Sequence, residues 1–182
     1  MTPSEYMGYL EDNPPTQVNG MQYCIQLYAL ARSIKAVNVL ELGLGWGHST
    51  RAFAAAIGSL GGGNITSVDL SDSIGAYHDE YMAKCNVKWM PVVSDISAYT
   101  HAGSIDLLYI DENPDNTLSD FHNFYNSVVP GGLIVMDGVG NKPFDKQPTA
   151  TKAVVDLTEL GYQIVSLPYC PEYCHAVYRK EG

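Results

Sequence analysis

The feature that most constrains the fold is a regular alternation between short apolar runs and amphipathic segments along residues 38–179. Each apolar run has the length of a buried strand, and most of those in residues 38–137 are followed by a segment with helical spacing. The expected strands are residues 38–42, 64–69, 87–93, 105–111 and 133–137, and the expected helices are residues 49–57, 73–84, 118–128 and 148–160, with a short turn or helix at 95–100. Strands that alternate with helices form parallel sheets with helices on both faces.

The two ends of the chain complete this pattern. Apolar residues recur at helical spacing over residues 18–34, which predicts one more helix before the first strand. The last two apolar segments, 162–167 and 174–179, are too close for a helical crossover and must pair as an antiparallel hairpin. We therefore predict an α/β, Rossmann-like, doubly wound and mostly parallel seven-stranded sheet with a C-terminal antiparallel hairpin. A length of 182 residues suits one domain, residues 1–182, with residues 1–37 as a helical extension.

Composition limits the partners. The chain has 10 basic and 20 acidic side chains, a formal charge of −10, which repels phosphate backbones and acidic lipids. We therefore expect no nucleic acid and no membrane as a partner. The first 15 residues do not resemble a secretory signal, and no run approaches the roughly 20 apolar residues of a membrane span. The four cysteines suit reduced thiols, so a cytoplasmic location is expected.

A glycine-rich loop follows the first expected strand. Residues 41–50 read Glu-Leu-Gly-Leu-Gly-Trp-Gly-His-Ser-Thr, with a glycine at every second position after an acidic residue. Glycines allow a ligand to approach the backbone closely, and the helix that follows offers free N–H groups. The dinucleotide fingerprint requires a glycine at the position of His48, so the spacing disfavours such a cofactor. Taken alone, the loop is also compatible with a plain tight turn between a strand and a helix.

Together with downstream acidic residues, this loop resembles the first motif of class I S-adenosylmethionine (SAM)-dependent methyltransferases, and the resemblance extends over almost the whole chain. It implies that Glu41 supports the loop, that Asp69 binds both ribose hydroxyls, and that Asp95 accepts a hydrogen bond from adenine. Trp46 and Ser49 would flank the methionine end. The resemblance assigns cofactor binding to Glu41, Gly43, Gly45, Trp46, Gly47, Ser49, Asp69, Leu70, Asp95, Ile96 and Asp111.

The acceptor side of such a site requires different groups. Methyl transfer from a sulfonium relies largely on alignment, but a hydroxyl acceptor also needs a base or a metal for its proton. Asp111 and Asp137 end the fourth and fifth expected strands, side by side at the ligand edge of the sheet. We take both as catalytic candidates. His48, next to the glycine loop, is a third candidate, although it also suits a helix-start residue that points away.

Within the superfamily, residues 110–116 and 130–137 resemble the catechol and caffeoyl-CoA O-methyltransferase group and its cephalosporin-hydroxylase-like relatives. In those enzymes acids at the positions of Asp111 and Asp137 hold a divalent metal. Two residues depart from that pattern, because Gly138 replaces a third ligand and Pro114 replaces a lysine or histidine. Two carboxylates with water would hold Mg²⁺ only weakly. We therefore assign no metal ligand and leave weak Mg²⁺ binding open.

Four further features have weaker interpretations. Cys170, Cys174 and His175 suggest zinc, but a structural site needs four ligands and no second cysteine pair is near in sequence. Tyr169 and Tyr173 could shape an acceptor pocket. Residues 138–147 suit either a lid, with Lys142 or Lys146 meeting an anionic substrate, or a solvated connection. His101 precedes the fourth strand, at the opposite edge of the sheet, and we therefore set it aside as a candidate.

The leading hypothesis is a SAM-dependent methyltransferase that acts on an oxygen or nitrogen of a small-molecule acceptor. One alternative is a SAM-binding or interaction protein without catalysis, because the expected third metal ligand is missing. Another is an NAD(P)-dependent oxidoreductase, suggested only by the shared architecture. The resemblance also allows a homodimer, since members of this superfamily often pair.

Overall fold

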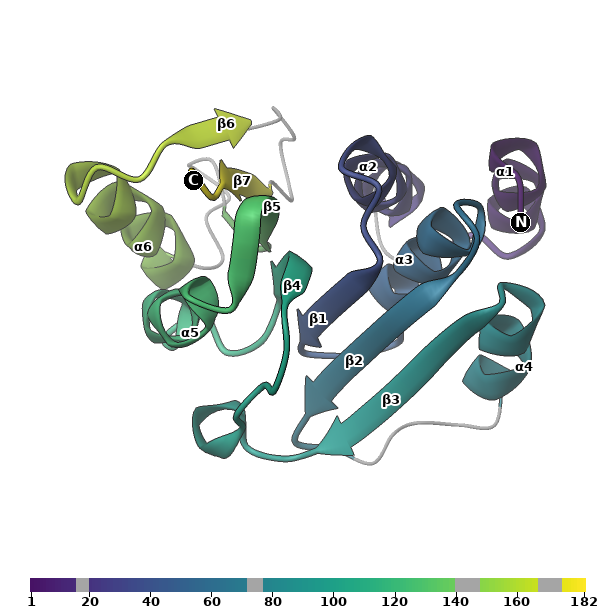
Figure 1. Cartoon of the computed structure of the whole chain (residues 1–182), viewed down its shortest axis with the longest axis horizontal. Helices are drawn as coiled ribbons and strands as arrows, with labels where there is room; N and C mark the ends of the chain where they lie inside the picture. The colour runs from purple at the N-terminus through teal and green to yellow at the C-terminus, as the bar shows by residue number, and fades with distance from the viewer. Residues whose placement is uncertain (16–19, 72–76, 140–147, 167–174) are drawn as a thin grey trace.

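The computed structural model describes residues 1–15, 20–71, 77–139, 148–166 and 175–182. Its centre is a seven-stranded sheet of order β3-β2-β1-β4-β5-β7-β6 (Figure 1). The first five strands are parallel, and β7 pairs antiparallel with both β5 and β6. The strands are β1 (Asn38–Leu42), β2 (Gly63–Asp69), β3 (Val87–Val93), β4 (Ile105–Ile110), β5 (Val128–Met136), β6 (Ile164–Ser166) and β7 (Ala176–Arg179). The predicted fold class, including the terminal hairpin, is confirmed.

Helices cover both faces of this sheet, as Figure 1 shows. They are α1 (Pro3–Asp12), α2 (Gly20–Ser33), α3 (His48–Gly58), α4 (Tyr77–Lys84), the short 3₁₀ helix η1 (Ile96–Ala98), α5 (Thr117–Tyr125) and α6 (Pro148–Glu159). Successive strand residues point to opposite faces, so Val39 joins the core shared with α1 to α4, whereas Leu40 joins the core shared with η1, α5 and α6. Two apolar layers therefore hold the sheet between two sets of helices.

The structure differs most from the sequence prediction at two elements. Helix α1 was not predicted as a separate element, although Thr2 and Glu5 form a capping box and Pro3 follows the cap. Strand β5 begins at Val128, five residues before the predicted start at residue 133. Residues 130–132, Pro-Gly-Gly, lie inside this strand, and the Gly131 amide donates to the carbonyl of Lys180 at 2.7 Å.

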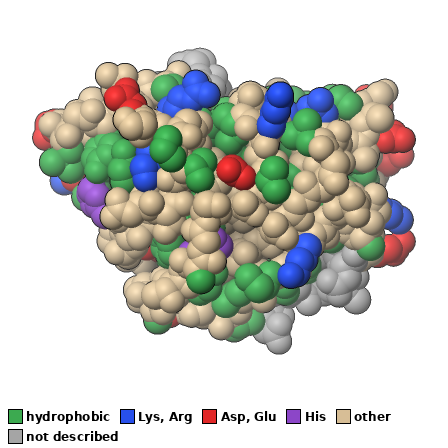
Figure 2. Space-filling view, viewed as in Figure 1, with side chains coloured by type: hydrophobic (Ala, Val, Ile, Leu, Met, Phe, Trp, Pro, Cys, Tyr) green, Lys and Arg blue, Asp and Glu red, His purple; other side chains and the backbone are tan. Residues whose placement is uncertain are grey.

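Some smaller predictions fall within the described residues and others do not. The helix expected at residues 73–84 is described from Tyr77 onward, and the hairpin connection at 167–174 lies outside the described residues. Cys24 and Cys85 are buried free thiols, whereas Cys170 and Cys174 are not among the described residues. Of the helices that the structure describes, none is long and apolar enough to cross a membrane. Figure 2 shows acidic and basic side chains scattered over one face of the molecule.

Candidate functional site

The loop between β1 and α3 has the backbone shape that only glycine adopts easily. Gly43, Gly45 and Gly47 have φ values of 90°, 49° and 68°, in the left-handed region. A Cβ on Gly43 would lie 1.9 Å from the carbonyl oxygen of Asp111, so this glycine lets the loop cross the end of β4. A Cβ on Gly45 would meet no atom within 4 Å. The loop is therefore packed against the sheet at its start and open at its middle.

Glu41 lies beneath this loop with no exposed surface. Its carboxyl group accepts hydrogen bonds from Ser49 Oγ at 2.5 Å and Thr50 Oγ1 at 2.8 Å, in the first turn of α3, and from Ser67 Oγ at 2.5 Å in β2. Burial raises the pKa of Glu41 to about 7, and the three hydroxyl donors oppose part of that rise. Glu41 thus ties β1 to the helix that follows the loop.

Asp69, the last residue of β2, faces the loop from the neighbouring strand. Its Oδ2 accepts from the amides of Leu44 at 2.8 Å and Gly45 at 3.3 Å, and its Oδ1 accepts from the amide of Ser71 at 2.9 Å. Burial alone would raise the pKa of Asp69, but these amide donors hold it below its ordinary value. Asp69 is therefore an ionised carboxylate beside the open part of the loop. Leu70, the next residue, is 71% exposed.

The other predicted cofactor residues occupy varied positions. Asp95 is exposed and caps η1 by accepting from the Ser97 amide at 2.9 Å, while Ile96 is buried. Trp46 projects from the loop with 79% of its surface exposed. Ser49 is buried and turned toward Glu41, and so it lies under the loop rather than on its open side. Their contacts with a cofactor stay predictions.

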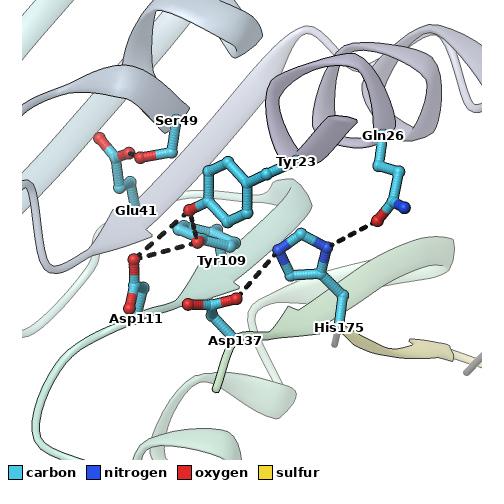
Figure 3. Close-up of polar contacts among 8 residues, drawn as sticks. All are labelled: Tyr23, Gln26, Glu41, Ser49, Tyr109, Asp111, Asp137 and His175. Atoms are coloured by element: carbon cyan, nitrogen blue, oxygen red, sulfur yellow. Dashed lines mark hydrogen bonds and ion pairs between the residues drawn. The ribbon is translucent and has the colours of Figure 1, made fainter. Parts of the chain in front are cut away.

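Asp111 and Asp137 follow β4 and β5, the neighbouring strands that the sequence placed side by side, and the structure brings their carboxyl groups together (Figure 3). Burial, and then the charge of Asp137, raises the pKa of Asp111 well above its ordinary value. The predicted third candidate, His48, begins α3, and its Nδ1 lies 2.8 Å from a guanidinium nitrogen of Arg51. A role for His48 as a base stays a prediction.

Two tyrosines that the sequence did not single out as candidates hydrogen-bond to Asp111. Tyr109, inside β4, donates to Asp111 Oδ2 at 3.1 Å, and Tyr23 of α2 reaches the same oxygen at 3.4 Å. The two phenol groups also hydrogen-bond to each other. Figure 3 shows Tyr23 entering from the helix above the strand ends. The N-terminal helical extension thus contributes directly to the site.

On the other side, His175 lies immediately before β7 and is 1% exposed. Its Nε2 lies 3.1 Å from Asp137 Oδ1, and its Nδ1 lies 3.2 Å from Gln26 Oε1 of α2. The sequence suggested His175 only as a doubtful zinc ligand beside Cys170 and Cys174, which lie outside the described residues. His101, which was set aside, lies at the opposite edge in a groove with Asn38 and Asn64.

A strand order of 3-2-1-4-5-7-6, a glycine loop after β1 and an acid at the end of β2 define the class I methyltransferase fold. Comparison with known proteins agrees. A family model described as a methyltransferase domain matches residues 40–139, more than half of the chain. The chain therefore belongs to this methyltransferase domain family, which confirms the enzyme class predicted from the sequence. A search of curated proteins finds no match.

Solved structures of methyltransferases share the fold. The N-methyltransferase NodS from Bradyrhizobium japonicum, in complex with S-adenosylhomocysteine, is 20% identical with a TM-score of 0.71, over 96% of this chain and 91% of that one. An O-methyltransferase from Bacillus cereus, also with S-adenosylhomocysteine, is 17% identical with a TM-score of 0.65, over 95% and 96% of the two chains. TomG from Streptomyces achromogenes, an O-methyltransferase in complex with SAM, is 19% identical with a TM-score of 0.66, over 93% and 83%.

Proposed function

We propose that this chain binds SAM at the carboxyl edge of its sheet and transfers the methyl group to an oxygen or nitrogen of a small-molecule acceptor. The observation that carries the proposal is the open glycine loop with Asp69 hydrogen-bonded beside it. Family membership supports it, and so do the cofactors in the crystal structures of NodS and TomG. We also propose that residues 1–182 act as one domain, because α2 contributes Tyr23 to the same edge.

The cofactor residues have distinct tasks in this proposal. The backbone of residues 43–47, which offers N–H groups and no side chain at Gly45, would hold the amino-acid portion. Asp69 would bind the ribose hydroxyls, and the Ser71 hydroxyl, which donates to its Oδ1 at 3.1 Å, would give way to them. Asp95, exposed at the end of β3, would accept from the adenine amine. When bound, SAM supplies an already activated methyl group.

The protein's own contribution to the reaction is alignment and proton handling. Asp111 lies at the end of β4, where Gly43 meets its backbone, and so it is next to the methionine end of the proposed cofactor site. Its raised pKa suits a carboxylate that accepts a proton from the acceptor atom. Tyr109 and Tyr23 hold one oxygen of Asp111 in place. Asp137, which follows the neighbouring strand β5, would face the acceptor beside Asp111.

Isothermal titration calorimetry with S-adenosylhomocysteine tests the cofactor assignment. We expect the wild-type protein to bind it and Asp69→Asn to bind it at least about tenfold more weakly, the usual effect of losing a charged hydrogen bond. Glu80→Gln is the matched control, because it removes an exposed carboxylate that forms an ion pair with Lys84 in the next turn.

Unchanged affinity in Asp69→Asn would refute the assignment. Saturable NAD(P) binding without a response to SAM would instead favour an oxidoreductase. Tight SAM binding without turnover over a broad panel of hydroxyl and amine acceptors would favour a SAM-binding protein that lacks catalysis.

A further inference from the structure

In each of the two acids at the centre of the site, one carboxylate oxygen already lies close to a protein side chain. His175 Nε2 lies 3.1 Å from Asp137 Oδ1, and the phenol groups of Tyr109 and Tyr23 lie 3.1 and 3.4 Å from Asp111 Oδ2. Figure 3 shows these partners approaching from α2, β4 and the start of β7. A divalent cation shared by the two acids would have to compete with the imidazole and the phenol groups for these oxygens.

His175 is held in this position from three directions. Gln26 Oε1 contacts Nδ1 at 3.2 Å, and the ring of Tyr23 packs against the imidazole with the centroids 4.8 Å apart. Tyr109 meets the imidazole edge-on at 6.2 Å. The imidazole is 1% exposed and is packed between these side chains, so it has little room to turn. Its Nε2 and Asp137 Oδ1 are both buried and lie 3.1 Å apart, although their geometry is not that of a hydrogen bond. The imidazole is thus a fixed part of the site.

The remaining donor set does not fit a resident divalent metal. Ca²⁺ takes six to eight oxygen ligands, and Mg²⁺ binds through one or two carboxylates and completes its octahedron with water, so either ion needs carboxylate oxygens that face it. After Asp137 the chain continues with Gly138, which is buried, has a φ of 72° and offers no side chain. In the part of the chain that the structure describes, no group of three or more histidine, cysteine, aspartate or glutamate side chains is placed to hold a metal. The weak Mg²⁺ site left open by the sequence is therefore not supported by these residues.

We propose that His175, held in place by Gln26, is a positioning residue. It occupies the side of the Asp111–Asp137 pair on which a divalent cation would bind, so that this chain orients its two acids with a side chain instead of a cation. The proposal rests on the proposed function for its catalytic meaning, because the pair lies beside the proposed methyl donor. The exclusion of metal by His175 does not depend on cofactor binding, and it is tested separately.

Titration with Mn²⁺ followed by electron paramagnetic resonance measures metal binding directly, since the signal of free Mn²⁺ falls when the ion binds. We expect the wild-type protein to show no binding that depends on Asp137, so wild type and Asp137→Asn should give the same titration up to about 1 mM Mn²⁺, in the range of weak protein cation sites. Any difference between the two titrations is then specific to the Asp111–Asp137 pair, because nonspecific binding of Mn²⁺ to the acidic surface is common to both proteins.

The variant His175→Ala should bind one Mn²⁺ at least about tenfold more tightly than wild type, because it frees Asp137 Oδ1 and opens space beside it. Adding Asp137→Asn to this variant should abolish the gain. His175→Gln keeps an N–H donor in reach of Asp137 and should stay within about threefold of wild type. Because glutamine both fills the space and offers an N–H donor, the comparison tests whether an occupied position beside Asp137 excludes the cation.

Three results would overturn the proposal. One is a wild-type site for Mn²⁺ that Asp137→Asn removes, and this comparison needs no histidine variant to fold. Another is a folded His175→Ala protein, checked by circular dichroism, that gains no affinity. The third is equal gain in the alanine and glutamine variants. Calorimetry with S-adenosylhomocysteine on the same samples separates the two proposals. If the wild-type protein does not bind this cofactor product, the proposed function is refuted, whereas the Mn²⁺ titrations still test the role of His175.

Discussion

Glu41 carries a carboxyl group that is fully buried yet surrounded by hydroxyl groups rather than by a cation. Its three donors, Ser49, Thr50 and Ser67, satisfy both oxygens, but they do not remove the free-energy cost of burying a charge. The pKa of Glu41 is therefore raised from 4.5 to about 7. Because the folded state holds its proton more tightly than the unfolded state, the free energy of unfolding falls as pH rises through this interval and levels off above it.

We predict that Glu41→Gln weakens this pH dependence. The wild-type free energy of unfolding should fall by about 2–3 kcal/mol more than that of the variant between pH 4.5 and pH 7.5, at about 1.4 kcal/mol per unit of pKa difference. Urea unfolding at several pH values measures the difference between the two proteins, which cancels contributions from other acids. Parallel curves for the two proteins would show that Glu41 is ionised throughout the range in the folded state.

At the scale of elements, α5 is joined to the end of β4 by a second pair of acids. Asp120 of α5 and Glu112, which follows Asp111, are close enough that burial, and then the carboxyl group of Glu112, raise the pKa of Asp120 to about 8. Asp120 Oδ2 and Glu112 Oε1 are buried and meet no hydrogen-bond donor among the described residues. The contact between these elements is therefore favourable only while the pair holds a proton.

We predict that Asp120→Asn stabilises the protein at pH 9, by about 1–3 kcal/mol, and changes little at pH 5. An amide can donate to Glu112 at any pH, whereas the aspartate loses its proton as pH rises through about 8 and leaves two facing carboxylates. Thermal unfolding at both pH values measures the change. Asp115→Asn, at an exposed position, is the control and should show no such contrast. Destabilisation of Asp120→Asn at pH 9 would contradict the prediction.

At the scale of the whole molecule, the N-terminal helices are part of the main core. Tyr6 and Leu10 of α1 are 1% and 3% exposed and join the same cluster as Phe53 of α3 and Val39 of β1. Helix α2 packs in that cluster too, while it presents Tyr23 and Gln26 to the site. The stability of the extension and the geometry of the acidic pair are thus linked through one packed layer.

We predict that Leu10→Ala lowers the free energy of unfolding by about 2–5 kcal/mol, because it leaves a cavity in this core. Met7→Ala on the exposed side of α1 should lower it by less than about 1 kcal/mol. Equilibrium denaturation in urea compares the two variants. Similar, small effects in both would mean that α1 contributes little to the core in solution.

Much of this architecture was predictable from sequence because the signals are local. Strands β1 and β3 begin and end where the apolar runs predicted, and the acids at strand ends follow from where those runs stop. The glycine positions also follow from local backbone needs, since Gly45 and Gly47 have φ values closed to most side chains. The start of β5 was predicted five residues too late because proline and glycine, here Pro130 and Gly131, usually occur in turns. Only pairing with neighbouring chain segments keeps these two residues in a strand.

The sequence by itself determined the fold class, the loop and the candidate acids, because hydrophobic periodicity and glycine spacing act over a few residues. The tertiary structure alone decided which groups surround Asp111 and Asp137. Tyr23 and Tyr109 are 86 residues apart, and Gln26 and His175 are 149 residues apart, so no local pattern relates them. They meet because packing the extension against the sheet carries one face of α2 over the carboxyl ends of β4 and β5.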